Sequence, residues 1–177
     1  MEHGITWNYQ IHTDKRNYLR LSVFICGFNE LDLRRLKNEK NRKEIRLQKT
    51  LVIIKPDGVR RGLIGQVISR FEKKGMKIIE LKMLQLSREK AEELYSPHVG
   101  KDFYEPLLSF ITSGPIVVMV LEAENAIPIV RKIIGATSPL EAIPGTIRGD
   151  YSLDVQQNLV HASDSEENAK REIAIFF

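Results

Sequence analysis

The residues best suited to chemistry lie in one short segment, Asn158-Leu-Val-His-Ala-Ser-Asp164. Its histidine, His161, follows a short apolar run and precedes a small residue and a Ser-Asp pair that can open a helix. An imidazole becomes a nucleophile when a neighbouring group, such as a carboxylate, fixes which ring nitrogen carries the proton. A lone histidine after a strand is more often structural, but the residues around this one favour chemistry. We therefore hypothesise that His161 accepts and passes on a phosphoryl group.

Cations that could hold a phosphate occur at three positions. Lys55 ends an apolar run at a turn, Arg131 lies on an expected helix, and Arg148 lies in a long loop. Each alone would usually be a solvated surface charge, so it is their combination with the histidine that favours a site. Residues 58–65 contain glycines but lack the Gly-Lys-Ser/Thr of a P-loop, and no Gly-x-Gly-x-x-Gly occurs. Side chains must therefore bind any phosphate, arginine through paired hydrogen bonds and lysine as a point charge.

The spacing of apolar residues predicts alternating strands and helices from Thr50 onward. We expect strands at 50–55, 76–86, 116–121 and 153–160, and helices at 63–74, 87–95 or 87–98, 103–112, 126–134 and 165–175. The segment 135–151 has no regular pattern, and long loops inside compact domains are usually functional. Without the extra helices the order is βαββαβ. This order predicts an α+β, ferredoxin-like antiparallel sheet with helices on one face, extra helices, and a long phosphate-binding loop.

Helix caps are expected at two places. Asn125 precedes the helix 126–134, and Ser163 or Asp164 precedes the last helix. Ser163 and Glu166 also have the spacing of a capping box, in which each side chain pairs with the other's backbone N–H.

Charge divides the chain at residue 47. Residues 1–46 carry 10 lysine and arginine residues against 6 acidic ones, which accounts for the whole net charge of +4. Residues 47–177 are neutral, which argues against general nucleic-acid binding by that part. We expect 1–46 to be a flexible or partly helical extension, or an arm that binds a membrane surface or a partner, and 47–177 to be a catalytic domain. A single cysteine, Cys26, and no apparent membrane span or signal peptide favour an intracellular protein.

Residues 47–177 resemble the nucleoside diphosphate kinase family along their whole length. The segment around His161 is similar to the family's motif around its phosphorylated histidine. Three further blocks occur in the family's order with consistent spacing: Lys55-Pro-Asp-Gly58, Ser113-Gly-Pro115 and Pro144-Gly-Thr-Ile-Arg-Gly-Asp150. One such block is weak evidence, whereas four in order are specific. Two features depart from the family, because residues 1–46 have no counterpart there and its members usually continue past Phe177.

The resemblance implies a role for each matching residue. His161 is implied to be the nucleophile, phosphorylated on Nδ1, with Glu172 and Ser163 orienting its ring. Lys55 and Tyr95 are implied to lie near the transferring phosphate. The implied nucleotide-binding residues are Lys55 and Asn158 for the ribose, Arg131, Thr137 and Arg148 for the β- and γ-phosphates with Mg²⁺ between them, and Phe103 and Val155 on either side of the base, helped by Leu107.

The activity implied by the resemblance is ping-pong transfer of the γ-phosphate of ATP to nucleoside diphosphates through a phosphohistidine. Broad specificity is expected, because a base held by stacking alone is poorly distinguished from the others. The implied cofactor is Mg²⁺ carried by the nucleotide phosphates, since no cluster of carboxylates cages a metal. We interpret Asp57 and Asp164 as turn and cap residues, and His98 as structural or solvated.

The partners expected are ATP, nucleoside diphosphates and further copies of the chain, in a hexamer or a tetramer. We expect a cytoplasmic protein with no stable nucleic-acid or membrane partner. The alternative is a binding or regulatory protein with weakened catalysis on the same fold, because one fold can serve several functions. No motif residue is missing, which favours the enzyme.

Overall fold

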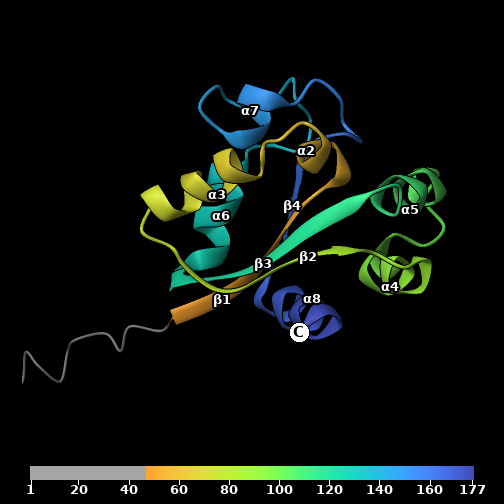
Figure 1. Cartoon of the computed structure of the whole chain (residues 1–177), viewed down its shortest axis with the longest axis horizontal. Helices are drawn as coiled ribbons and strands as arrows, with labels where there is room; N and C mark the ends of the chain where they lie inside the picture. The colour runs from red at the N-terminus through yellow and green to blue at the C-terminus, as the bar shows by residue number, and fades with distance from the viewer. Residues whose placement is uncertain (1–46) are drawn as a thin grey trace, which may run out of the picture. The chain divides into compact units, whose positions relative to one another are not determined.

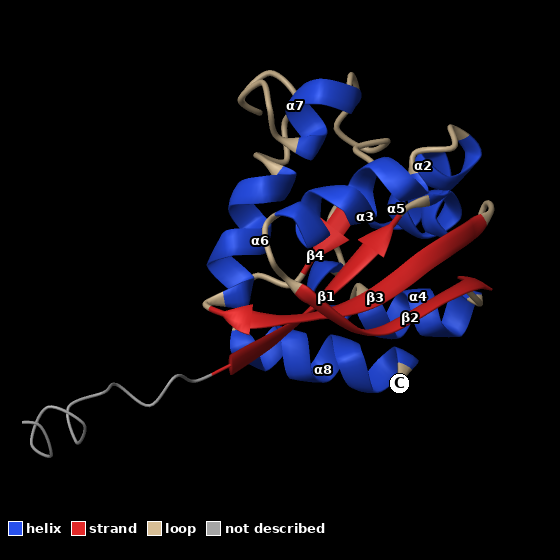
Figure 2. Cartoon of the chain, turned by 60° about the vertical axis from the view of Figure 1, so that its left-hand side comes forward, coloured by secondary structure: helices blue, strands red, loops and turns tan. Residues whose placement is uncertain are grey.

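A computed structural model describes residues 47–177, which form an antiparallel sheet covered by helices (Figures 1 and 2). The elements in chain order are β1 (Leu47–Ile54), α2 (Pro56–Arg60), α3 (Ile64–Lys73), β2 (Lys77–Gln85), α4 (Arg88–Leu94), η1 (Ser96–His98), α5 (Tyr104–Ile111), β3 (Pro115–Glu124), α6 (Ala126–Ile134), α7 (Ile147–Tyr151), β4 (Val160–Ala162) and α8 (Glu166–Phe176). None of the helices in this part of the chain is long and apolar enough to cross a membrane. The expectation for the N-terminal extension, 1–46, lies outside the described residues.

The sheet has the strand order β2-β3-β1-β4, and every neighbouring pair is antiparallel. The elements β1, α3, β2, β3, α6 and β4 reproduce the expected βαββαβ order, so the ferredoxin-like prediction is confirmed. In β1, Ile53 lies opposite Val118 of β3 on one side and opposite His161 of β4 on the other. The register therefore fixes the position of His161 along the strands of the sheet.

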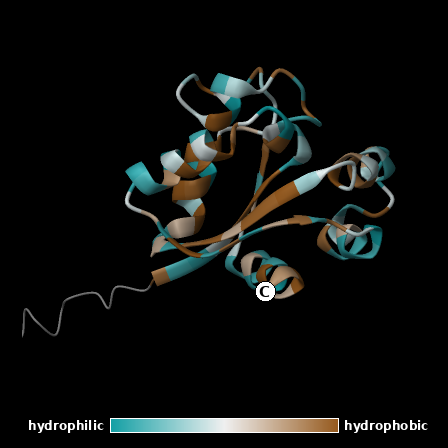
Figure 3. Ribbon diagram, in the orientation of Figure 1, coloured by the Kyte–Doolittle hydropathy of each residue, from teal (hydrophilic) through white to brown (hydrophobic). Residues whose placement is uncertain are grey.

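Both faces of the sheet are buried, and each has its own apolar core. Val52 and Ile54 of β1 face the helices α3 and α6, whereas Leu51 and Ile53 face α4, α5 and α8. The two helices of the ferredoxin-like plan share one face as expected, and additional helices cover the other. Because alternate residues of a strand point to opposite faces, a strand buried on both sides needs apolar residues throughout. Figure 3 shows this composition along the middle of β1 and β3.

The expected strand 153–160 is wrong, because only Val160 at its end belongs to β4. Leu153 is 100% exposed, so the apolar residues that suggested a strand do not mark a buried face. Oδ1 of Asp154 accepts hydrogen bonds from the backbone N–H groups of Gln156 and Gln157, at 2.7 and 2.9 Å. Such local side-chain bonds offer the backbone an alternative to a strand ladder.

Two short helices and one cap also differ from the expectation. The turn predicted at residues 56–58 opens the helix α2, with proline in its first turn, and the long loop 135–151 contains α7. The last helix is capped by Ser165, whose Oγ accepts from the N–H of Asn168, so the capping box predicted at Ser163 is wrong. Asn125 does occupy the N-cap position of α6, but its side chain makes no capping hydrogen bond there.

Candidate active site

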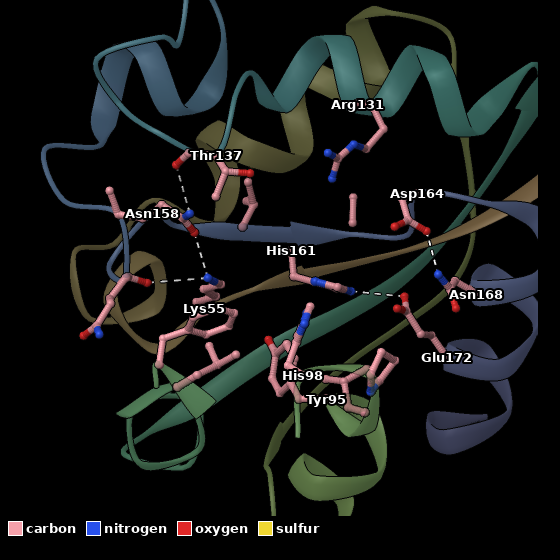
Figure 4. Close-up of a pocket in the computed structure, with 18 of the residues that line it drawn as sticks. Lys55, Tyr95, His98, Arg131, Thr137, Asn158, His161, Asp164, Asn168 and Glu172 are labelled. Atoms are coloured by element: carbon pink, nitrogen blue, oxygen red, sulfur yellow. Dashed lines mark hydrogen bonds and ion pairs between the residues drawn. The ribbon is translucent and has the colours of Figure 1, made fainter. Parts of the chain in front are cut away.

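A cavity of about 610 Å³ opens where β1 ends and β4 begins, between α6 on one side and α4, α5 and α8 on the other (Figure 4). The structure brings together in its wall every sequence-predicted site residue except Ser163, namely Lys55, Tyr95, Phe103, Leu107, Arg131, Thr137, Arg148, Val155, Asn158, His161 and Glu172. These residues are spread over more than a hundred positions of the chain. Their convergence therefore depends on the fold and not on sequence proximity.

The strand register explains why Lys55 and His161 face the same cavity. Residues directly opposite each other in an antiparallel pair share a face, so His161 lies on the face of its partner Ile53. Lys55 follows Ile53 by two positions and points to that same side. This face is the one covered by α4 and α8, which bring Tyr95 and Glu172 to the histidine.

Glu172 and Ser163 fix the orientation of the imidazole. Nε2 of His161 lies 3.1 Å from Oε2 of Glu172, and Oγ of Ser163 donates to the same oxygen at 2.7 Å. A carboxylate can only accept, so Nε2 carries the hydrogen and Nδ1 keeps a lone pair. No residue in the described range 47–177 makes a hydrogen bond to Nδ1. Among the described residues, the lone pair of Nδ1 is therefore left without a partner.

The acidity of Glu172 supports this assignment of the proton. Burial by itself raises the pKa of this carboxyl group, but hydrogen bonds from His161 and Ser163 and the charge of Arg171 lower it, and the net pKa is below the usual value. Hydrogen bonds to the charged form of a carboxyl group stabilise that form. Glu172 is therefore a carboxylate at neutral pH although its side chain is only 6% exposed.

Lys55 and Asn158 form a buried polar pair at the floor of the cavity. Nζ of Lys55 donates to Oδ1 of Asn158 at 2.7 Å and to the backbone oxygen of Gln156 at 3.5 Å. Nδ2 of Asn158 donates in turn to the backbone oxygen of Thr137 at 3.3 Å (Figure 4). Burial and the charge of Arg148 lower the pKa of Lys55 to about 8. A desolvated ammonium of this kind attracts an anion strongly.

Two arginines of the cavity, Arg148 and Arg131, have different surroundings. Arg148 is buried, and its guanidinium donates to the backbone oxygens of Gly135, Asn158 and Val160, at 2.9, 3.3 and 2.7 Å. Burial and the charge of Arg131 lower its pKa to about 10. Three of the five N–H groups of the guanidinium are thus used by the protein, which leaves two for a ligand. Arg131 is exposed and extends from α6 toward the cavity (Figure 4).

A row of rings forms the wall opposite the arginines. The ring of Tyr95 meets that of His161 edge-on, with centroids 5.9 Å apart, and His98 lies between Tyr95 and Phe103, at 6.1 and 5.5 Å. The hydroxyl of Tyr95 is buried without a hydrogen-bond partner, and burial raises its pKa. Nδ1 of His98 lies 3.0 Å from Nζ of Lys101, and burial and that charge lower the pKa of His98.

Sequence reasoning missed several residues of this wall. His98 was interpreted as structural or solvated, but it lines the cavity three positions after Tyr95. Arg171 also lines it, one position before Glu172, and lies 3.6 Å from the Oε1 atom of Glu172. Asp164 accepts from Nδ2 of Asn168 at 2.7 Å and lines the cavity with it. The signal available for His98 and Arg171 was their proximity in sequence to Tyr95 and Glu172.

The donors of the cavity suit a polyanion. Lys55, Arg131, Arg148 and Arg171 supply four cations to its wall, and no group of three or more His, Cys, Asp or Glu side chains in residues 47–177 could hold a metal ion. Magnesium in such sites is usually held by substrate phosphates with few protein ligands. The donor set therefore fits a phosphorylated ligand.

Comparisons with known proteins agree with this chemistry. Residues 48–177 match the family model described as nucleoside diphosphate kinase. The chain is 63% identical over 131 residues to a nucleoside diphosphate kinase from Sulfurisphaera tokodaii (74% of this chain, 89% of the relative), and 65% identical over 130 residues to one from Staphylothermus marinus (73% and 92%). Its fold is similar to a solved nucleoside diphosphate kinase from Halobacterium salinarum in complex with CDP, with a TM-score of 0.72, 48% identity, and coverage of 75% and 88%.

Proposed function

The chain belongs to the nucleoside diphosphate kinase family, and we propose that His161 carries the phosphoryl group between its two nucleotides. The reaction is transfer of the γ-phosphate of ATP to a nucleoside diphosphate. One observation supports the choice of residue and atom. Nε2 of His161 is bound to Glu172, so Nδ1 is the free nitrogen, and the ring lines a cavity that also contains the cations of Lys55, Arg131 and Arg148.

In the first half-reaction Nδ1 of His161 attacks the γ-phosphorus of ATP. The N–P bond forms as the bond to the bridging oxygen breaks, and ADP leaves with that oxygen. The hydrogen on Nε2 stays on the ring, where the carboxylate of Glu172 offsets the positive charge that the imidazole gains. A nucleoside diphosphate then replaces ADP, and its terminal phosphate oxygen attacks the phosphorus and restores His161. ADP leaves before the acceptor binds, and the phosphoryl group stays on His161 between the two halves, so the mechanism is ping-pong.

The cations of the cavity stabilise the charge that spreads over the phosphoryl oxygens in the transition state. Phosphoryl transfer needs little from a protein beyond an in-line nucleophile and fixed positive charge. Arg131, Arg148 and the hydroxyl of Thr137 would bind the β- and γ-phosphates, and Lys55 would lie closest to the transferring group, beside Tyr95. Lys55 and Arg148 are held in place by hydrogen bonds before the reaction, so their charges need little reorganisation during it.

Mg²⁺ is the proposed cofactor, held through the phosphates, and when bound it neutralises part of their negative charge. The residues that would face this metal–phosphate group are Arg131, Thr137 and Arg148. Arginine and hydroxyl donors hydrogen bond to phosphate oxygens, which fixes the polyphosphate in line with His161.

Nucleotide recognition away from the phosphates involves both polar and apolar groups. Asn158 and Lys55, paired at 2.7 Å, would bind the ribose hydroxyls. Phe103 and Val155 are both partly exposed in the cavity wall, and the base would lie between them with Leu107 beside it. Every base offers a flat face for stacking, so this contact supports broad specificity.

We also propose a homo-oligomer, a hexamer or a tetramer, in the cytoplasm. The edge strand β2 exposes Leu81 and Met83, and the loop before α7 exposes Leu140 and Ile143. Exposed apolar residues at a sheet edge favour pairing with another chain. Sedimentation equilibrium of the full chain tests the assembly, and a monomer at micromolar concentration would contradict it.

Incubation of the full chain with γ-labelled ATP and Mg²⁺ tests the role of His161. We expect label that is labile in acid and stable in base, and that disappears in His161→Ala. His98→Ala provides the control, because it removes the other imidazole of the same cavity wall and should still carry the label. Label that persists in His161→Ala would reject the proposal.

A further inference from the structure

The backbone makes a tight turn immediately before His161. The N–H of Val160 donates to the carbonyl oxygen of Asn158 at 2.8 Å, so a three-residue turn closes around Leu159. Leu159 has a φ of 66°, in the left-handed region that branched L side chains rarely adopt. A three-residue turn with positive φ at its centre is rare and strained. Other contacts must therefore hold this turn in place.

The segment 55–58 supplies those contacts. The N–H of Lys55 donates to the carbonyl oxygen of Leu159 at 2.8 Å, and the N–H of Leu159 donates to Oδ2 of Asp57 at 3.1 Å. Gly58 packs close by, since a Cβ there would lie 3.4 Å from the oxygen of Leu159 and 2.8 Å from a methyl group of Ile54. The backbone N–H and the carbonyl oxygen of Leu159 thus both bind residues of the segment 55–58.

The contact of Asp57 is not a helix cap. Asp57 lies in the first turn of α2, but α2 has no side-chain capping bond, and the partner of the carboxylate is 102 positions away in sequence. The side chain is buried, with the residue 1% exposed, and it does not line the cavity. The interpretation of Asp57 as a turn residue is therefore wrong, and a role in binding nucleotide directly does not fit its position.

We infer that Asp57 is a positioning residue for phosphoryl transfer, because its carboxylate holds the strained turn at Leu159 that places Asn158 and His161. The inference rests on His161 being the nucleophile. Asn158, which binds Nζ of Lys55, immediately precedes Leu159, and His161 follows it by two residues. Without an acceptor, the buried N–H of Leu159 would be unpaired, and the turn would relax toward negative φ. That relaxation would move the side chains of Asn158 and His161 relative to the bound phosphate.

The test compares Asp57→Ala with Asp57→Asn in the full chain. The measurement is the rate constant of phosphohistidine formation in a single turnover at saturating ATP and Mg²⁺, so that a change in affinity does not enter. We expect Asp57→Ala to slow this step about tenfold to a hundredfold, since small displacements of reacting groups cost rates of this order. Asparagine keeps an acceptor oxygen at the same place, so Asp57→Asn should react within about threefold of the native chain.

Met76→Ala is the control for a general loss of stability. Met76 is buried beside β2, one residue before Lys77, which the register places at the opposite end of the sheet from His161. At a temperature where all variants are folded by circular dichroism, Met76→Ala should keep a rate within about twofold of native, because its packing defect is remote from the reacting groups. Asp57→Ala reacting as fast as Met76→Ala would overturn the inference.

Two further outcomes are decisive. Asp57→Asn could be folded but as slow as Asp57→Ala. The reaction would then not depend on the hydrogen bond from the N–H of Leu159 to residue 57, and the inference fails. If Asp57→Ala does not fold, the Asp57→Asn result alone decides it in the same way. Absence of label on His161 in the native chain would instead reject the proposed function, so the two failures are distinguishable.

Discussion

Nζ of Lys55 lies 2.7 Å from Oδ1 of Asn158, and this bond joins the end of β1 to the segment that precedes His161. The ammonium group is buried, and its pKa falls from 10.5 to about 8 because of burial and the charge of Arg148, against the opposing effect of Asp57. Lys55 therefore changes charge close to physiological pH. Both activity and stability should depend on that change.

The value of kcat/KM for ATP should fall as pH rises above about 8. A lowered pKa means that the neutral amine, which cannot stabilise a phosphoryl group, appears at lower pH than in free lysine. Since kcat/KM reports the ionisation of the free enzyme, its pH profile measures this group directly. Lys55→Arg stays charged across the range, so its alkaline limb should move upward in pH. An unchanged limb in Lys55→Arg would assign the titration to another group.

The lowered pKa of Lys55 should also affect stability, but stability should rise with pH where activity falls. Between about pH 8 and 10.5 the unfolded chain binds the proton of Lys55 and the folded chain does not, so raising the pH stabilises the fold over this window. The expected gain is about 3 kcal/mol in the free energy of unfolding, relative to Lys55→Met. Urea titrations of both chains at several pH values test it. Parallel pH dependences of the two chains would contradict the prediction.

Glu172→Gln should slow phosphorylation of His161 by about a hundredfold or more, by analogy with other carboxylates that fix a catalytic histidine tautomer. The amide of glutamine can donate to Nε2, which would move the ring hydrogen to Nδ1 and remove the nucleophilic lone pair. Single-turnover labelling measures the rate, and ¹⁵N spectra of the imidazole report the tautomer. Glu167→Gln, an exposed change on the same helix, should leave both unaffected. A native rate in Glu172→Gln would show that the carboxylate does not set the tautomer.

The fold and most of the cavity could be predicted because both depend on regular patterns. Long apolar runs marked the central strands, and the expected βαββαβ order is what the sheet shows. The motif residues Lys55, Arg148 and His161 could be named in advance, and the structure does bring them to one cavity. The roles of these residues stay predictions.

The errors arose where tertiary contacts override local pattern. Residues 153–160 contain the apolar residues of a strand, but Leu159 has a positive φ, and its backbone binds Lys55 and Asp57 instead of a neighbouring strand. Ser163 has capping-box spacing, yet its hydroxyl binds Glu172, a partner that no local rule identifies. His98 was missed for the same reason, since its place between two rings depends on how η1 packs.

Arg148→Lys should reduce both stability and rate. Lysine cannot reach the three backbone oxygens that the buried guanidinium binds at once, so we expect a loss of about 2–4 kcal/mol in the free energy of unfolding. Arg131→Lys is the matched change on an exposed arginine of the same cavity and should alter stability by less than about 0.5 kcal/mol. Urea denaturation distinguishes them, and equal stability of the two variants would mean that the carbonyl contacts of Arg148 contribute little.

Phe103→Ala should weaken binding of all nucleoside diphosphates to a similar extent. Loss of one stacking ring costs about 1–3 kcal/mol whatever the base, so KM should rise about fivefold to 150-fold for purine and pyrimidine diphosphates alike. Phe177→Ala is the control, because that ring is equally exposed but does not line the cavity. Steady-state KM values for GDP, CDP and UDP with one donor give the comparison. A rise confined to one base would mean that polar contacts, and not the ring, recognise the nucleotide, because stacking depends on the face that all bases share.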